Sequence, residues 1–152
     1  MKISDKDSKV QGGFYSMNIL FFLLPKSEVA YLYDDYSVRQ AMEKMEHHKY
    51  AAVPIIDREG HYVGTLTEGD LLWELKNRNV HNLYETEELC ISRMRRRKDN
   101  EPVNVNCNIE DLVMTSMTQN FIPVVDDNRI FIGIITRKCI IEYCYKKLKE
   151  MN

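Results

Sequence analysis

Two seven-residue segments of the sequence share a spacing that could hold a nucleotide. Residues 64–70 read GTLTEGD, and 69 positions later residues 133–139 read GIITRKC. A strand glycine such as Gly64 lets a ligand or another backbone come close, and Thr67 would begin a helix whose unpaired N–H groups favour phosphate. Asp70, one turn later, offers two acceptor oxygens to a ribose diol. The spacing therefore predicts a nucleotide half-site at Gly64, Thr67 and Asp70.

The same three residues also fit a purely structural role. T-x-x-D is a capping pair in which Thr67 is the N-cap and Asp70 is the third helical residue, and such a cap stabilises a helix by about 1 kcal/mol. The two roles can coexist on one side chain. Ligand contact and helix cap therefore both remain interpretations of this segment.

The second segment keeps Gly133 and Thr136 but has Cys139 where the first has Asp70. A thiol accepts hydrogen bonds from a diol poorly, so we expect one dominant mononucleotide site per chain. Arg137 and Lys138 lie beside the helix start, where they would either bind phosphate or be solvated surface charges. Cys139 is either a small buried side chain or a redox-sensitive thiol with a lowered pKa.

The elements that must position these residues are predicted by periodicity. Residues 38–48 have apolar residues at helical spacing, and Ser37 with Gln40 forms a plausible capping box before them. AAVPII and HYVGTL read as two strands around a DREG turn. A second helix follows from Thr67 to about Lys76, with three leucines predicted inward: Leu71, Leu72 and Leu75.

The same order of elements returns in the second half of the chain. A helix near residues 109–113 precedes the strands FIPVV and IFIGII, and the last helix has an apolar stripe at Ile141, Cys144, Tyr145 and Leu148. The offset is 69 from Pro54 to Pro123. EVAYLY and PVNV predict one additional strand before each copy. Neither copy is large enough to hold a core alone, so the copies must pack together.

Composition limits the functional classes. A chain of 152 residues predicts one globular unit with a single core, and its net charge of −2 gives no reason to expect nucleic acid or an anionic membrane as a partner. Four cysteines without a C-x-x-C pair suit free thiols, and four histidines without ligand spacing predict no metal site. The apolar run ILFFLL is too short to span a bilayer. We therefore expect a cytoplasmic protein.

Other conspicuous residues indicate no catalysis. The sequence contains no nucleophile with base and orienting residue, no P-loop and no G-x-G-x-x-G, so we expect no enzyme and no catalytic residue. The basic run from Arg93 to Lys98 would clamp phosphates that enter a cleft, touch nucleic acid, or simply be solvated. Trp73, Phe21 and Phe22 are predicted in a core or dimer surface, since no basic and aromatic alternation surrounds them.

Two repeats of order β-α-β-β-α, each with a proline-containing strand (YAAVPIID and NFIPVVD) and a closing G-h-x-T-x-x-(D), resemble a tandem pair of cystathionine-β-synthase (CBS) domains. The resemblance to this Bateman module covers about residues 24–148. It implies an α+β fold of two pseudo-symmetric repeats packed together in a stand-alone module. The predicted divisions are an N-terminal extension at 1–17, repeat 1 at 18–77, a connector at 78–100 and repeat 2 at 101–152.

The resemblance also implies a ligand. Paired CBS repeats form two clefts that commonly bind adenosine-containing molecules, here AMP, ADP, ATP, S-adenosylmethionine or cyclic di-AMP, with no required cofactor. The family's threonine and aspartate roles fall on Thr67 and Asp70. Its usual adenine position falls on the backbone of one strand segment: Tyr50, Ala51, Ala52, Val53 and Pro54.

The implied function is regulatory. The module would bind its ligand between the repeats and signal to a partner protein that the sequence does not identify. A homodimer is expected through apolar helix faces that include Leu72, Ile141 and Tyr145. The alternative is a structural dimerisation or interaction module whose clefts are vestigial.

Overall fold

Four α-helices and seven short strands build the part of the chain that the computed structural model describes, residues 17–152. Residues 1–16, nearly all of the predicted N-terminal extension, lie outside it. The helices are α1 Val38–His48, α2 Glu68–Asn77, α3 Ile109–Ser116 and α4 Arg137–Glu150. The strands are β1 Leu24–Pro25, β2 Leu32–Tyr33, β3 Ala52–Ile56, β4 Tyr62–Thr67, β5 Val103–Asn104, β6 Phe121–Val125 and β7 Phe131–Thr136. Short 3-10 helices are η1 Ile19–Phe22, η2 Lys26–Glu28, η3 Leu83–Glu87 and η4 Ile91–Arg93.

The strands form two sheets with the same internal order. One sheet has the order β2-β3-β4 and the other β1-β7-β6-β5, and in each a short parallel strand precedes an antiparallel hairpin. Pro54 is opposite Thr65 in the first hairpin, and Pro123 is opposite Ile134 in the second. The registers are therefore equivalent at the offset of 69, which confirms the predicted α+β fold of two repeats.

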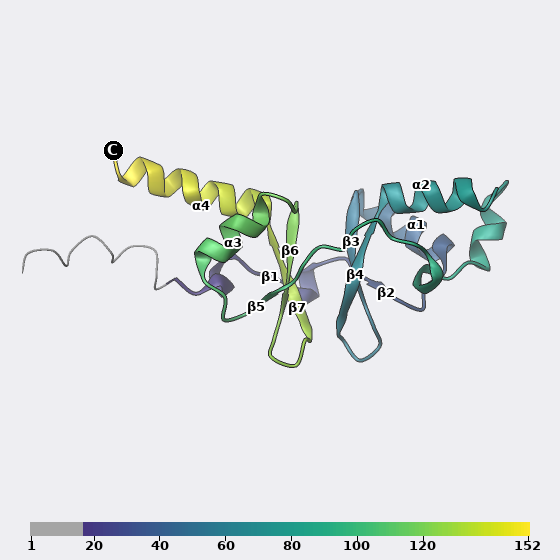
Figure 1. Ribbon diagram of the computed structural model, residues 1–152, viewed down its shortest axis with the longest axis horizontal. Helices are drawn as coiled ribbons and strands as arrows, with labels where there is room; N and C mark the ends of the chain where they lie inside the picture. The colour runs from purple at the N-terminus through teal and green to yellow at the C-terminus, as the bar shows by residue number, and fades with distance from the viewer. Residues whose placement is uncertain (1–16) are drawn as a thin grey trace, which may run out of the picture.

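The two sheets lie next to each other at the centre of the molecule, with the helices on the outer sides (Figure 1). The ends of the two hairpins meet, because the N–H of Phe131 donates to the carbonyl oxygen of Gly60 at 2.9 Å and His61 forms a bridge with Ile130. Among residues 17–152, no helix is both long and apolar enough to cross a membrane.

The buried apolar residues form two clusters rather than the single core expected from chain length. The first contains Leu32, Val38, Ala41, Met45, Val53, Ile55, Leu66 and Leu71, together with Ile91 and Met94. The second contains Ile109, Leu112, Ile122, Val124, Ile135, Ile140 and Tyr143, together with Ile19. Each sheet buries one face against its own helices, so each repeat has its own apolar cluster.

Both clusters include residues from a segment outside the repeat that they stabilise. Ile19 is 1% exposed in the second cluster, and the following strand β1 pairs with β7 of the second repeat. In the same way, Ile91 and Met94 of the predicted connector pack into the first cluster. Residues 19–25, which the predicted boundary assigns to repeat 1, therefore pack with repeat 2.

The helices begin as predicted but do not bury every predicted side chain. Ser37 Oγ accepts the N–H of Gln40 at 3.1 Å, and Gln40 Oε1 accepts the N–H of Ser37 at 2.9 Å. Leu72 is 58% exposed although it was predicted inward, because α2 turns Leu71 toward the sheet. The apolar stripe of α4 is exposed at Ile141, Tyr145 and Leu148, whereas Ile140 and Tyr143 are buried. α4 therefore packs on its sheet through Ile140 and Tyr143, and it extends beyond that sheet (Figure 1). The dimer contact expected at Ile141 and Tyr145 stays a prediction.

Candidate functional site

Thr67 and Asp70 form a reciprocal capping box at the start of α2. Thr67 Oγ1 accepts the N–H of Asp70 at 3.1 Å, and Asp70 Oδ2 accepts the N–H of Thr67 at 3.0 Å. The box satisfies two N–H groups that a helix leaves unpaired at its N-terminus. The capping role predicted for these two residues is therefore present.

Asp70 has a second partner that the sequence did not indicate. Its Oδ1 accepts the backbone N–H of Arg97 at 3.0 Å, and the residue is only 2% exposed. Both carboxylate oxygens therefore accept backbone N–H groups, one from Thr67, the N-cap of α2, and one from the connector. A ribose contact by Asp70 remains a prediction, and it requires the connector to move away from Oδ1.

The connector also covers Gly64. A Cβ at Gly64 would lie 2.5 Å from Asp99 Oδ1 and 2.6 Å from Arg96 Nη2, so the glycine makes room for this ion pair. Asp99 Oδ1 accepts the N–H of Thr65 at 2.9 Å and the Nε–H of Arg96 at 2.7 Å. Burial raises the pKa of Asp99, but the hydrogen bonds from Arg96 and Thr65 outweigh it and hold that pKa below its usual value.

The second motif forms the same cap without a carboxylate. Thr136 Oγ1 accepts the backbone N–H of Cys139 at 3.2 Å, which makes Thr136 the N-cap of α4. Gly133 has a φ of +156° and pairs with Pro25 of β1, and a Cβ there would overlap the carbonyl oxygen of Leu24. Each glycine of the repeated motif therefore leaves room for another segment. At Gly64 this is the connector, which precedes the second repeat, and at Gly133 it is β1, which precedes the first.

Residues 137–139 do not lie together in a cleft. Arg137 Nε donates to the carbonyl oxygens of Ser116 at 2.8 Å and Gln119 at 3.0 Å, so it ties α4 to the end of α3. The side chain of Lys138 is 84% exposed and lies 3.9 Å from Glu142. Burial, together with Glu142, raises the pKa of the Cys139 thiol, which disfavours the thiolate that a redox sensor needs. Phosphate binding by Arg137 and Lys138 stays a prediction.

A cleft of about 230 Å³ lies between the two repeats. Five predicted site residues line it: Tyr50, Ala51, Ala52 and Pro54 of the first repeat and Thr136 of the second. The lining is completed by Leu24, Val29, Ala30, Asn120, Phe121 and Ile134. Gly64, Thr67 and Asp70 are not among the lining residues. The structure thus places residues 50–54, where the adenine is expected, in one cleft with Thr136 of the second repeat.

The cleft is lined mainly by apolar side chains. Tyr50 is 44% exposed, whereas Val53 is 1% exposed and belongs to the first apolar cluster. Strand alternation turns the Val53 side chain away from the cleft, and the predicted contact of its backbone with a ligand stays a prediction. Such a cleft suits a nucleobase, with Thr136 at the start of α4 as its polar end.

The internal repeat could have predicted several of the missed lining residues. Asn120 and Phe121 follow Ala51 and Ala52 by 69 positions. Each pair makes the equivalent hydrogen bond in its own repeat. The Ala51 carbonyl oxygen accepts the N–H of Glu68, and the Asn120 carbonyl oxygen accepts the N–H of Arg137, both at 3.0 Å. Applying the offset to the whole strand segment would have identified both walls of the cleft.

One side-chain group in the described residues has ligand atoms close enough for a metal ion. Asp57, Glu59 and His61 lie in the turn between β3 and β4, with these atoms within 4.8 Å of one another. Asp57 Oδ1 accepts the N–H groups of Glu59 at 3.0 Å and His61 at 2.8 Å. The carboxylate therefore already stabilises the turn, which accounts for the cluster without a metal.

Comparison with known proteins identifies the fold and family. A model of the CBS domain matches residues 23–77 and 91–146, while no curated protein matches the chain. CbpB in complex with c-di-AMP is a similar solved structure, 25% identical with a TM-score of 0.78, and the match covers 89% of each chain. A CBS domain protein from Streptococcus pneumoniae TIGR4 is 27% identical with a TM-score of 0.76, covering 85% of this chain and 87% of that one.

A plant structure shows the same fold at lower identity. CBSX2 from Arabidopsis thaliana, in its complex with AMP, is 23% identical with a TM-score of 0.67 and covers 88% of this chain and 98% of its own. The two segments matched by the family model contain both hairpins, both capped motifs and the cleft between them. The chain therefore belongs to the CBS domain family, as a tandem pair of CBS domains of the Bateman type.

Proposed function

We propose that this CBS pair is a sensor of an adenosine-containing nucleotide that binds in the central cleft. The observation that carries the proposal is the meeting of two walls: residues 50–54 of the first domain lie opposite Thr136 and Phe121 of the second. Apolar walls suit the base, and the N-terminus of α4 favours a phosphate near Thr136. The c-di-AMP in the CbpB structure and the AMP in the CBSX2 structure support this class of ligand.

Regulation follows from the place of the cleft between two packed domains. A ligand there contacts both domains, so it can change their relative orientation if it binds one arrangement more tightly than another. The changed orientation would be passed to a regulated partner protein. The ligands that we expect are AMP, ADP, ATP, S-adenosylmethionine or cyclic di-AMP.

A thermal-shift panel of these five ligands tests the proposal. A ligand that binds only the folded state raises stability by RT ln(1 + [L]/Kd), so at about 100 times Kd the gain is roughly 2.7 kcal/mol. Ala51 is exposed and lines the cleft, so Ala51→Phe should fill the cleft and remove the ligand-induced shift while the unliganded melting temperature changes little. Val63→Phe adds similar bulk on an exposed strand residue outside the cleft and should keep the shift.

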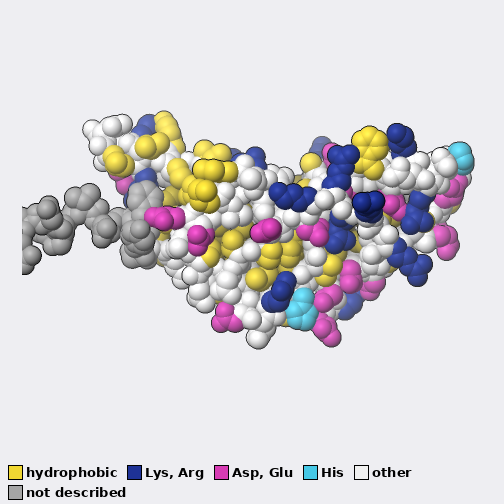
Figure 2. All heavy atoms as spheres, in the orientation of Figure 1, with side chains coloured by type: hydrophobic (Ala, Val, Ile, Leu, Met, Phe, Trp, Pro, Cys, Tyr) yellow, Lys and Arg dark blue, Asp and Glu magenta, His cyan; other side chains and the backbone are white. Residues whose placement is uncertain are grey.

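The structural-module alternative rests on a different observation. Leu72 on α2 and Ile141 and Tyr145 on α4 are each 58% exposed, which leaves apolar surface for a homodimer or another partner. Figure 2 shows hydrophobic side chains gathered over the α4 side of the molecule. If none of the five ligands stabilises the chain, and light scattering shows a dimer that Tyr145→Asp dissociates, the alternative replaces the sensor.

A further inference from the structure

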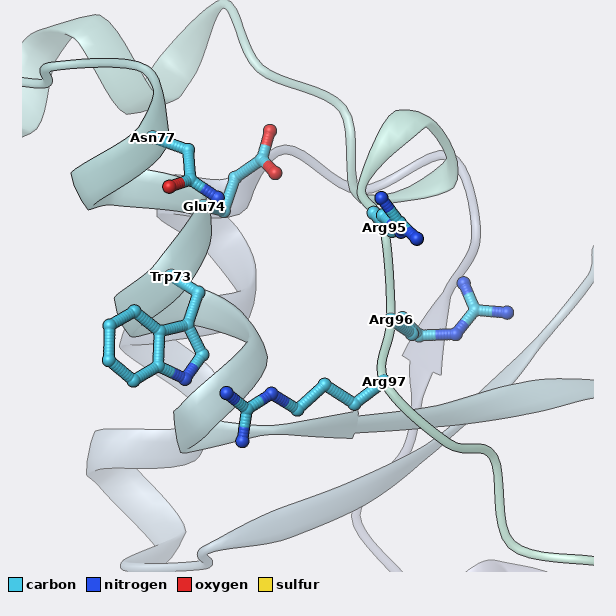
Figure 3. A pocket seen from close by; sticks show the side chains of 6 residues that line it. All are labelled: Trp73, Glu74, Asn77, Arg95, Arg96 and Arg97. Atoms are coloured by element: carbon cyan, nitrogen blue, oxygen red, sulfur yellow. The ribbon is translucent and has the colours of Figure 1, made fainter.

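A second cavity lies on the outer side of the first domain, between α2 and the connector. It has a volume of about 530 Å³ and six lining residues: Trp73, Glu74 and Asn77 from α2, and Arg95, Arg96 and Arg97 from the connector. Figure 3 shows the α2 side chains along one wall and the arginines along the other. This groove shares no lining residue with the central cleft, so it is a separate site.

The groove has two guanidinium groups that no carboxylate neutralises. Arg96 points away from α2 (Figure 3) and pairs with Asp99 at 2.7 Å. Glu74, the one acid in the lining, pairs with Arg78. Within residues 17–152, neither Arg95 nor Arg97 forms an ion pair. The remaining charge of the groove is therefore positive, although the whole chain has a net charge of −2.

The backbone that carries these arginines is anchored. The N–H of Arg97 donates to the buried Asp70, and Met94, just before Arg95, is 6% exposed in the first apolar cluster. The guanidinium of Arg97 lies 5.2 Å from the ring centre of Trp73, which limits where that side chain can go. Arginines on an anchored backbone lose less conformational entropy on binding a ligand than arginines on a freely moving segment.

We infer that this groove binds the diphosphate or triphosphate group of a ligand. Arginine guanidinium groups present paired N–H donors that match phosphate oxygens, and two such groups suit a multiply charged anion. The volume exceeds the need of one phosphate but suits a compact polyphosphate. An extended acidic peptide would instead need a longer row of cations, and Arg93 and Lys98 lie outside the lining.

Tryptophan fluorescence of the full chain gives a local measurement. Trp73 is the single tryptophan, so titration with inorganic pyrophosphate should change its emission and saturate. Loss of a charge-assisted pair typically weakens binding by roughly tenfold to a hundredfold, and Arg95→Gln with Arg97→Gln should show at least the lower figure. Arg93→Gln with Lys98→Gln removes the same charge from exposed connector residues outside the groove and should change affinity by less than about twofold.

The choice of probe separates this site from the cleft and distinguishes the source of the phosphates. If ATP and ADP change the Trp73 emission as pyrophosphate does, the ligand is a nucleotide. If only pyrophosphate changes it, the ligand is the free anion. Either result supports phosphate binding in the groove. Adenosine, which lacks phosphate, should leave the Trp73 emission unchanged. Ala51→Phe should abolish cleft binding and keep the pyrophosphate response, so the two proposals can fail separately.

Three outcomes would overturn the inference. They are no saturable response to pyrophosphate, equal losses in the two double variants, and a response only to an acidic peptide. Arg95→Gln alone keeps the inference testable if the double variant unfolds, because Arg95 is exposed. It should weaken pyrophosphate binding by roughly tenfold without lowering the melting temperature.

Discussion

Asp70 links two segments through one buried carboxylate. Asp70→Ala would leave the N–H groups of Thr67 and Arg97 without acceptors. An unsatisfied group costs about 1–3 kcal/mol when it is buried, which would give about 2–6 kcal/mol for two such groups. Because Arg97 is exposed, water can replace part of the lost contact, so we expect the free energy of unfolding to fall by about 2–4 kcal/mol in urea denaturation. Cys139→Ala is the matched control, because there the backbone N–H and not the thiol contacts Thr136.

The control at position 139 should cost less than about 1 kcal/mol. Equal losses at positions 70 and 139 would show that the connector contact contributes nothing. If Asp70 also holds a ribose, Asp70→Ala would in addition weaken adenosine more than pyrophosphate.

Asp99 makes the stability of the connector depend on pH. Its folded-state pKa lies below the unfolded value of about 3.9, so its carboxylate stabilises the folded state above that value. This contribution is lost as pH falls through the lower folded pKa, where the native state also becomes protonated. Asp99→Asn should therefore flatten the decline in unfolding free energy below about pH 4, measured by urea denaturation at several pH values. An unchanged slope would contradict this.

At the scale of elements, the two motif glycines should differ in cost when replaced. In Gly64→Ala the new Cβ meets the ends of the Asp99 and Arg96 side chains, which can swing aside. In Gly133→Ala it meets the Leu24 carbonyl of β1, a paired strand, at a positive φ. We expect about 1 kcal/mol or less for Gly64→Ala and about 2–4 kcal/mol for Gly133→Ala in thermal unfolding. A larger cost at Gly64 would mean that the connector cannot yield.

At the scale of the molecule, the segment before each domain stabilises the other half. Ile19 is 1% exposed in the cluster of the second domain, so Ile19→Ala should lower the free energy of unfolding by about 2–4 kcal/mol. Leu20→Ala is the control, since Leu20 is 44% exposed. Hydrogen exchange should show the loss in α3, α4 and β6 before α1. Loss in the first domain alone would contradict this arrangement.

The sequence determined the features that depend on neighbouring residues. Helix caps at Ser37, Thr67 and Thr136 link residues three apart, and each hairpin register follows from its own turn and strand alternation. The repeat offset of 69 then predicted that both halves would build the same unit. These interactions are local, so residue type and spacing are sufficient to specify them.

The tertiary structure decided which segments meet across the molecule. Asp70 meets Arg97, 27 positions away. Residues 50–54, which pair with Thr67 in their own hairpin through Ala52, also line one cleft with Thr136 of the other repeat. The tertiary structure also placed Trp73 beside the arginines of the connector and left Ile141 exposed. Two repeats with the same strand order and hairpin register offer each segment equivalent partners in either half. Only the burial of long-range apolar contacts, such as Ile19 in the second cluster, selects between them.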